Sequence, residues 1–375
     1  MNEIDKYISE KNFDEALQEC IRSSHNSLGL LISHIATSKG CTIQKILTQQ
    51  LQTNIDGLKT EMKIIEETKN DDISDNPSLM SDEENDPKIR VKLLTNWTTS
   101  AHLRELWNKM SQGNYTWNNI QVVLDDDPDY FVVINAPPKN VDITDPSKTI
   151  IFQMEPYMEN KNKHIWKEWA KPDPKMFFKV CTHENEYNNN EWHLSKTYTE
   201  LKNMHVEKDN KLDNIVSTVL SAKYHDPGHI KRVDFAKFMA NKGIPVHVFG
   251  SNKWEYKDYK GSLPSHQKDD AMFPYKYVFN VENNSIKNYY TEKLIDGILA
   301  ECLVFYSGCY NIRDFIDPKA YVYLELSNFE EDYQKVKKAI EDNLWEKRID
   351  IIRKEKQKIL DHLQFFPRLE RIING

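Results

Sequence analysis

The sequence predicts an α/β protein with two Rossmann-like domains, and two observations carry this prediction. The chain has 375 residues, which is too long for one ordinary hydrophobic core. Short apolar runs rich in β-branched and aromatic residues alternate with amphipathic runs in a β-α-β-β order, and the connections are short. This arrangement occurs twice along the chain, in residues 89–210 and again in residues 211–350.

Residues 89–210 form the first predicted domain. One helix is expected at residues 101–110, where Leu and Trp recur at helical spacing. Runs of Val, Ile, Leu and Phe between polar or Pro-containing turns indicate the strands. The expected strands are 89–97, 120–126, 130–137, 149–155 and 177–183.

Residues 211–350 form the second predicted domain, which repeats the pattern. Its expected helices are 231–243, which ends in Gly, and 291–301. Its expected strands are 215–221, 245–250, 275–282 and 303–308. A helical pattern then runs from about residue 329 to 370, acidic early and basic later as the helix dipole favours, and Pro367 is expected to interrupt it. Residues 351–375 are taken as a C-terminal helical tail.

Two further segments precede these domains. Residues 1–66 are expected to be helical, because apolar residues recur at a spacing of three to four and Pro is absent. They form a cap or dimerisation arm, or alternatively a module that binds a protein partner. Residues 67–88 are rich in acidic residues and contain Pro, Ser and Asn, so we expect a linker.

The bulk composition excludes several classes of protein. A net charge of −8 argues against a general nucleic-acid binder. No apolar run approaches the roughly 20 residues that a membrane span needs, and the N-terminus lacks the apolar stretch of a signal peptide. The five Cys are widely spaced and form no Cys-x-x-Cys pair, so no zinc site of that kind and no disulfide framework is expected. We therefore expect a cytoplasmic protein.

The most informative segment is residues 275–293, YKYVFNVENNSIKNYYTEK. It passes from a strand through a polar loop to a helix start, and ligands of open α/β sheets bind where such loops meet helix N-termini. Glu292 and Lys293 bring opposite charges to this edge. A capped helix without a ligand, with Thr291 or Asn288 as its N-cap, explains the same residue types.

The segment resembles the signature of the α1,3/α1,4-fucosyltransferases, whose core reads Tyr-Lys-Phe, then Phe-Glu-Asn-Ser/Thr, then Tyr-x-Thr-Glu-Lys. Here it stands as Tyr275-Lys276-Tyr277, Val281-Glu282-Asn283-Asn284 and Tyr289-Tyr290-Thr291-Glu292-Lys293, and Phe315-Ile316-Asp317-Pro318 continues the likeness. The resemblance covers about residues 89–330. It implies the GT-B fold, in which two Rossmann-like domains face each other, and it is closer to bacterial or large-virus members than to Golgi-anchored ones.

The resemblance implies transfer of fucose from GDP-fucose, with inversion, to a glycan hydroxyl such as O3 of GlcNAc or glucose. It implies that Lys293 faces the diphosphate and Glu292 the ribose, and that Glu282, Asn283 and Tyr289 line the same donor pocket. Chemistry agrees with the charges, because a departing diphosphate builds up negative charge that a fixed cation stabilises. No cofactor is required by this scheme.

A second basic position follows the strand at 215–221. By resemblance, an Arg at the start of the next helix contacts the diphosphate, and Arg232 is the best match with Lys231 as its rival. A planar guanidinium can make paired bonds to phosphate oxygens, which favours Arg232. Alternatively, both are solvated helix charges. His225 and His229 flank this turn, and we do not expect them to bind a metal.

The candidate base is Glu155, at the end of the predicted strand 149–155 and just before Pro156. The resemblance implies an acidic residue at this place as general base, since direct displacement requires a carboxylate to take the proton of the incoming hydroxyl. Glu159 and Glu184 are its rivals, and a solvated strand-end Glu is the bland alternative.

The polar loop at residues 182–194 is the candidate acceptor contact, through His183, Glu184 and Trp192. An ordinary surface loop explains it equally. Asp125, Asp126 and Asp127 could be mistaken for a metal clamp, but Pro128 follows them and indicates a turn, so no metal is expected there.

Two other functions stay open. The fold could serve the same chemistry with another GDP- or UDP-sugar, or it could persist as a catalytically silent protein that binds glycans or nucleotides.

Overall fold

The structure is a computed structural model, and it describes residues 88–139, 145–156, 169, 171–185, 191–221, 223–224, 227–250 and 256–375. The chain divides into two compact units, 1–84 and 85–375, and the described residues belong to the second unit. The predicted helical extension 1–66 and almost all of the predicted linker 67–88 lie outside the described residues, as do Glu159 and His225. No helix in the described ranges is long and apolar enough to cross a membrane.

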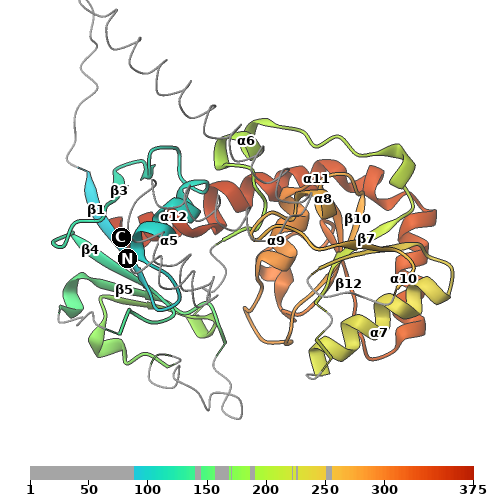
Figure 1. The fold of residues 1–375 in the computed structure, drawn as a ribbon, viewed down its shortest axis with the longest axis horizontal. Helices are drawn as coiled ribbons and strands as arrows, with labels where there is room; N and C mark the ends of the chain where they lie inside the picture. Colours follow the sequence, from blue (N-terminus) through green and yellow to red (C-terminus); the bar gives the residue numbers. More distant parts are fainter. Residues whose placement is uncertain are drawn as a thin grey trace, which may run out of the picture. The chain divides into compact units, whose positions relative to one another are not determined.

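The first sheet contains six strands in the order β2-β3-β1-β4-β5-β6 (Figure 1). Its neighbours pair in parallel, except that β2 and β3 form an antiparallel edge. The strands are β1 (Ile89–Thr95), β2 (Thr116–Trp117), β3 (Ile120–Val122), β4 (Tyr130–Ile134), β5 (Thr149–Phe152) and β6 (Lys179–Cys181).

The second sheet contains six parallel strands in the order β12-β11-β10-β7-β8-β9. Its strands are β7 (Val216–Val219), β8 (Val246–Phe249), β9 (Tyr259–Gly261), β10 (Tyr277–Val281), β11 (Leu303–Ser307) and β12 (Tyr321–Tyr323). The strands β5, β10 and β11 are buried along their whole length, as expected for parallel strands that are covered on both faces. The predicted pair of Rossmann-like α/β layers is confirmed.

Helices connect and cover the strands. The α-helices are α5 (Ser100–Asn108), α6 (Tyr198–Asn203), α7 (Pro227–Asn241), α8 (Asp269–Met272), α9 (Glu292–Leu299), α10 (Phe329–Glu341), α11 (Leu344–Lys358) and α12 (Phe365–Asn374). Short 3-10 segments lie at Pro146–Lys148, Pro174–Met176, His183–Asn185, Asn210–Leu212 and Ile312–Asp314, and a π-helical turn lies at Ile359–Leu363.

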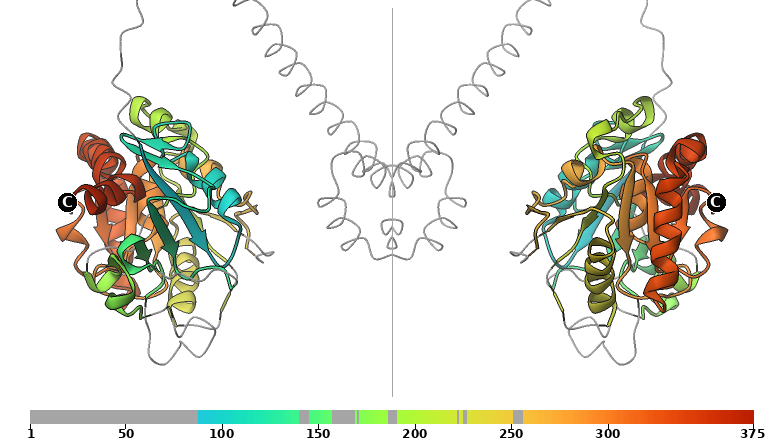
Figure 2. Two further views of the ribbon diagram at one scale, coloured as in Figure 1. Left: turned by 90° about the vertical axis from the view of Figure 1, so that its left-hand side faces the viewer. Right: turned by 90° about the vertical axis from the view of Figure 1, so that its right-hand side faces the viewer.

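Helices α7 and α9 cover opposite faces of the second sheet. Helix α7 leads from β7 to β8, whereas α9 leads from β10 to β11, and these two crossovers run in opposite directions across the sheet. Because such crossovers are right-handed, the two helices lie on opposite faces. The right-hand view of Figure 2 shows the yellow helix α7 beside the orange strands of this sheet.

The C-terminal helices differ from the predicted tail. The predicted boundary between residues 350 and 351 falls inside α11, which is continuous from Leu344 to Lys358. Pro367 does not interrupt a helix, because it lies in the first turn of α12, where a missing N–H costs nothing. The break comes earlier, at the π-helical turn and at Gln364, whose side chain caps α12 by accepting from the N–H of Phe366.

Helix α12 packs against the first sheet, although it follows the second sheet in the chain. The ring of Phe365 lies 4.7 Å from that of Trp107 and 5.4 Å from that of Phe152, between centroids. The indole N–H of Trp117 donates to Glu370 at 2.9 Å. The end of the chain therefore completes the core of the first domain (Figure 1).

Candidate active site

The strand order of the second sheet reverses between the neighbouring parallel strands β7 and β10. Strands β8 and β9 lie to one side of this pair and β11 and β12 to the other. In open α/β sheets, ligands bind at the carboxyl ends of the strands at such a switch point. The segments that follow β7 and β10 carry Ser221, Arg232 and Asn283, so most of the predicted donor residues meet here.

Glu282 anchors the loop after β10. Its side chain is fully enclosed, and its carboxylate accepts from the backbone N–H of Thr291 at 2.8 Å and from the Thr291 hydroxyl at 2.8 Å. The Thr291 hydroxyl in turn accepts from the N–H of Lys293 at 3.3 Å and caps α9. The structure therefore uses Glu282 to hold the loop to the helix, and no carboxylate oxygen is left open for direct contact with a donor sugar.

Thr291 is thus the N-cap of α9, one of the two residues expected in that role. Asn288 instead donates from its side chain to the carbonyl of His183 at 2.7 Å, which ties this loop to the first domain. The capped helix, one of the two alternatives from the sequence, is therefore present. The cap fixes the helix N-terminus beside charged groups that remain near the surface.

Glu292 and Lys293 form an ion pair of 3.2 Å at the start of α9. Burial by itself would raise the pKa of Glu292, but Lys293 and Lys268 hold it well below its usual range. Burial opposes the charge of Lys293 as well, yet Glu292 and Glu282 outweigh it and raise the lysine pKa above its ordinary value. Both residues are therefore charged at neutral pH.

Arg232 is buried in the first half of α7, with 6% of its surface exposed. Its Nη1 donates to the side-chain oxygen of Asn283 at 2.8 Å, and its Nη2 reaches Ser221 at 3.5 Å. Its Nε is enclosed and has no hydrogen-bond partner among the described residues. Burial lowers the pKa of Arg232, and Glu282 and Glu292 oppose that effect. A buried cation with spare donor capacity is suited to an anionic ligand.

Lys231, the rival of Arg232, is exposed and lines a cavity of about 380 Å³ between α7 and the ends of β10 and β11. The cavity depends on the close approach of α7 to the loop, because a Cβ at Gly228 would lie 2.0 Å from the backbone oxygen of Asn283. The other residues that line it are Pro227, Val281, Glu282, Asn284, Ser285, Ser307, Gly308, Glu325 and Leu326.

Glu155 belongs to the first domain and interacts electrostatically with Lys293, Glu292 and Glu282 of the second domain. It lies beyond the end of β5 at Phe152, so the predicted strand 149–155 is too long and Glu155 stands on a loop. The side chain is exposed, but the surrounding protein removes part of its hydration and so raises its pKa. The positive charge of Lys293 acts in the opposite direction and lowers that pKa. The two residues therefore lie within electrostatic reach of each other.

Tyr289 lies between these groups and is buried, with 3% of its surface exposed. Burial raises the pKa of its hydroxyl, and the carboxylates of Glu282, Glu155 and Glu292 raise it further. The hydroxyl is therefore a neutral donor in every ordinary buffer. The environment of Tyr289 therefore includes charges from both domains.

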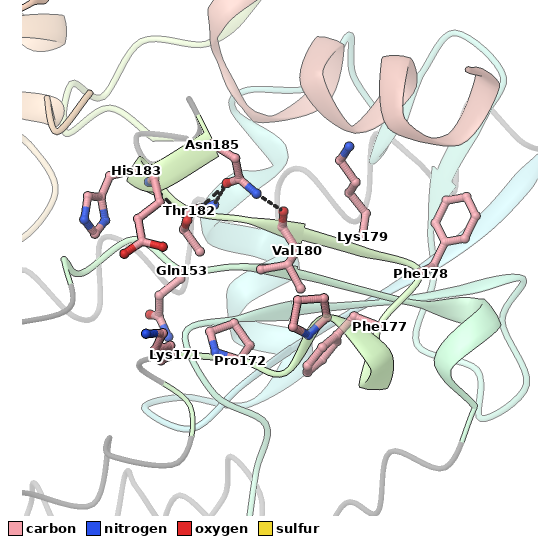
Figure 3. Close-up of a pocket in the computed structure, with 12 residues that line it drawn as sticks. Gln153, Lys171, Pro172, Phe177, Phe178, Lys179, Val180, Thr182, His183 and Asn185 are labelled. Atoms are coloured by element: carbon pink, nitrogen blue, oxygen red, sulfur yellow. Dashed lines mark hydrogen bonds between the residues drawn. The ribbon is translucent and has the colours of Figure 1, made fainter. Parts of the chain in front are cut away.

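The predicted acceptor residues divide into two groups. His183 and Glu184 follow β6 and line a pocket of about 490 Å³, which is drawn in Figure 3. Burial lowers the pKa of His183, and its enclosed Nδ1 has no hydrogen-bond partner among the described residues. Trp192 is a correction, because only 1% of it is exposed and its N–H donates to the carbonyl of Lys196 at 3.0 Å. It is a core residue and offers no face for a sugar to stack on.

Sequence reasoning missed other residues of this pocket. Figure 3 shows Gln153 near His183, whereas Phe177, Phe178 and Lys179 lie toward the start of β6. The ring of Phe178 is 46% exposed, which no local pattern could indicate in a strand-like run. Its ring lies 5.6 Å from that of Tyr130, between centroids, at the start of β6.

The acidic turn at Asp125–Asp127 is a surface feature. Arg90 pairs with Asp125, and Lys92 pairs with Asp126 at 2.8 Å. Lys148 lies 3.9 Å from Asp127. Each carboxylate has a cation of the protein beside it, as expected for a turn.

The two Rossmann-like α/β sheets are consistent with the GT-B fold. Residues 207–343 match the family described as glycosyltransferase family 10 (fucosyltransferase), C-terminal part. This match covers residues 207–343 of the 375, and over this region it agrees with the resemblance seen in the sequence. A comparison with curated proteins gave no match.

Three solved structures of similar fold are distant in sequence. An α-glucosyltransferase in complex with UDP and DNA is 10% identical, with 76% of this chain and 99% of that chain covered and a TM-score of 0.50. An α1,3-fucosyltransferase with GDP-fucose is 15% identical, with 78% of this chain and 95% of that chain covered and a TM-score of 0.44. T4 phage BGT in complex with UDP and Mn²⁺ is 11% identical, with 76% of this chain and 100% of that chain covered and a TM-score of 0.41. At such identities the likeness concerns the fold alone.

Proposed function

We propose that the protein is an inverting fucosyltransferase that moves fucose from GDP-fucose to a hydroxyl group of a glycan, such as O3 of GlcNAc or glucose. The observation that carries the proposal is the meeting of Arg232 and Lys293 at one sheet edge with Glu155 from the other domain within reach of their charge. The family match of residues 207–343 supports the choice of donor. A cytoplasmic location is part of the proposal.

In the proposed reaction, the acceptor oxygen attacks the anomeric carbon of fucose. The new C–O bond forms as the bond from that carbon to the phosphate oxygen breaks, and GDP leaves with the electron pair. The acceptor proton passes to the carboxylate of Glu155. A carboxylate whose pKa is raised is a better base than a solvated one, so the environment of Glu155 suits this role.

The donor half would act through charge. Arg232 can offer Nη2, which makes only a long contact with Ser221, to a phosphate oxygen, while Lys293 stands at the N-terminus of α9, where backbone N–H groups also favour anions. These groups stabilise the negative charge that grows on GDP as it leaves, and they are in place before the reaction begins. Tyr289, held neutral, can donate to an oxygen of the donor.

The cavity beside α7 supports a guanine nucleotide. Glu325 lines it and is exposed, so its carboxylate can accept from the amino group of guanine, which uracil lacks. Glu325→Gln should therefore weaken GDP more than UDP. Equal loss of both nucleotides, or of neither, would contradict this orientation of the base.

The test measures nucleotide release from GDP-fucose, GDP-mannose, UDP-glucose and UDP-GlcNAc, with and without lactose or N-acetyllactosamine. We expect turnover with GDP-fucose and faster release when acceptor is present. Turnover of UDP-sugars alone would overturn the donor assignment. Neither turnover nor GDP binding would leave a silent binding protein as the better description.

A matched pair of variants tests the base. Glu155→Gln keeps the size of the side chain and should keep GDP affinity while transfer falls about 10²- to 10⁴-fold. Glu184→Gln changes the other candidate for the base among the described residues. It should change only the KM for the acceptor and leave kcat unaltered. Unchanged transfer by Glu155→Gln would eliminate it as the base, and the reverse pattern would move that role to Glu184.

A further inference from the structure

Three residues outside the proposed catalytic scheme bring metal-binding atoms together. Glu191 and His193 lie in the segment before α6, and His266 lies in the turn before α8. One carboxylate oxygen and one ring nitrogen from each His all lie within 4.8 Å of one another. The Oε1 of Glu191 and the Nε2 of His193 are 3.2 Å apart, which is close to the separation of two ligands on one tetrahedral ion.

We propose that Glu191, His193 and His266 form a binding site for a divalent cation of the zinc type. Imidazole nitrogens suit Zn²⁺ and its neighbours Co²⁺ and Ni²⁺, whereas Mg²⁺ and Ca²⁺ prefer oxygen ligands. Three protein ligands leave a fourth position for water. The side chains of Glu191 and His193 are 19% and 20% exposed, so an ion can enter and is still enclosed on most sides.

Neighbouring groups already orient two of the ligands. The indole N–H of Trp107 donates to the second oxygen of Glu191 at 3.0 Å, while Oε1 lies 3.2 Å from Nε2 of His193. The backbone N–H of His193 donates to Asp296 at 2.7 Å and fixes its place on the segment. Residues that hold metal ligands in this way reduce the entropy lost when the ion binds. Substitution of such supporting residues usually weakens metal binding roughly 10- to 100-fold.

Two lysines oppose a cation here, and acidic partners balance them. Lys268 lies near His266, but it makes ion pairs of 2.8 Å with Asp296 and 3.4 Å with Glu292. Lys109 donates to the carbonyl of Leu194 and lies within reach of the charges of Asp296 and Glu191. The local field is therefore near balance, and ligation by Glu191 adds the negative charge that favours the ion.

The proposed ion would join the two halves of the fold beside the donor loop. His193 belongs to the segment that leaves the first sheet, while His266 belongs to the second sheet's domain. Lys268, two residues beyond His266, pairs with Glu292 at the start of α9. Ion binding would thus hold the segment of residues 191–193 to the turn that supports the donor loop.

The test uses the full chain without a histidine tag, freed of metal by a chelator that is then removed. Titration with Zn²⁺ should show one tight site, Co²⁺ should give the visible absorption of a nitrogen- and oxygen-ligated ion, and Mg²⁺ should give neither. Zn²⁺ should also raise the melting temperature. Absence of stoichiometric Zn²⁺ and Co²⁺ binding to the wild-type protein would overturn the proposal, whatever its transferase activity.

Variants assign the ligands. We expect a loss of Zn²⁺ affinity of at least roughly 10- to 100-fold, the loss usual when residues that support metal ligands are changed, in each of three variants: His193→Ala, His266→Ala and Glu191→Gln. His102→Ala is the control, because His102 is exposed on α5, and it should bind Zn²⁺ like wild type. Glu191→Gln keeps the side-chain shape, so its circular dichroism should match wild type. If it folds normally and binds Zn²⁺ with full affinity, the three-residue site is wrong.

Discussion

Replacing Arg232 by Lys should weaken the binding of GDP much more than removing the neighbouring Lys231. The substitution keeps a positive charge in the first half of α7 but removes the planar fork of the guanidinium. Arg232 is buried and Lys231 is exposed. Burial strengthens a charge-assisted hydrogen bond, so the two adjacent cations should contribute differently to GDP binding.

The expected magnitude follows from the hydrogen bonds of Arg232. One terminal nitrogen is committed to Asn283 at 2.8 Å and the other makes a long contact of 3.5 Å with Ser221. The Nε–H is enclosed, so Nη2, which makes only this long contact, is the donor that a phosphate oxygen would use. A hydrogen bond to a charged group contributes about 1.5–3 kcal/mol. Loss of this one bond corresponds to a roughly 10- to 150-fold rise in the Kd of GDP.

Isothermal titration calorimetry with GDP on the wild type, Arg232→Lys and Lys231→Ala measures this difference directly. Lys231→Ala should change the Kd by less than about threefold, because an exposed charge contributes little. Circular dichroism of both variants checks that α7 is intact. A loss below about threefold in Arg232→Lys, or equal losses in the two variants, would refute the assignment of the diphosphate to Arg232.

Three further predictions concern the same site. Glu155 acts as a base only when it is deprotonated, and its pKa is raised. The acid limb of the pH profile of kcat/KM, measured from about pH 4 to 8, should therefore have its midpoint above the ordinary pKa range of a Glu side chain. A midpoint within that range would contradict this role. Glu282→Ala should lower the free energy of unfolding by about 2–5 kcal/mol, measured in urea, because two buried donors of Thr291 lose their acceptor. Gly228→Ala should weaken GDP binding in calorimetry, since the added Cβ would lie 2.0 Å from the carbonyl oxygen of Asn283 and force α7 away; unchanged affinity would show that this contact does not shape the donor cavity.

The sequence predicts the strand, loop and helix at residues 275–299 well because their information is local. A buried strand, a polar loop and a capped helix follow one another within residues 275–299, and each has its own residue pattern. The strands β2, β9 and β12 were missed because they are two or three residues long and show no period. Sheet pairing creates these edge strands, and pairing is not a local property.

The errors at single residues have the same origin. Trp192 was expected at the surface because its neighbours in the sequence are polar, but burial depends on what packs over a residue. Glu282 was placed in the donor pocket as a ligand, whereas its carboxylate turns toward Thr291. Glu191, His193 and His266 have no recognisable spacing, since two distant segments must meet before their ligand atoms do.

The return of α12 to the first sheet affects how the chain can fold during synthesis. Residues 359–375 supply Phe365 and the partner of Trp117, so the first domain lacks part of its core until the ribosome has made the whole second domain. Its strands must wait in an incomplete state, with Trp107 and Phe152 uncovered on the side that α12 will occupy. A shortened chain that ends before residue 359 should for that reason be prone to aggregate, and neither domain can be separated from the other by a single cut.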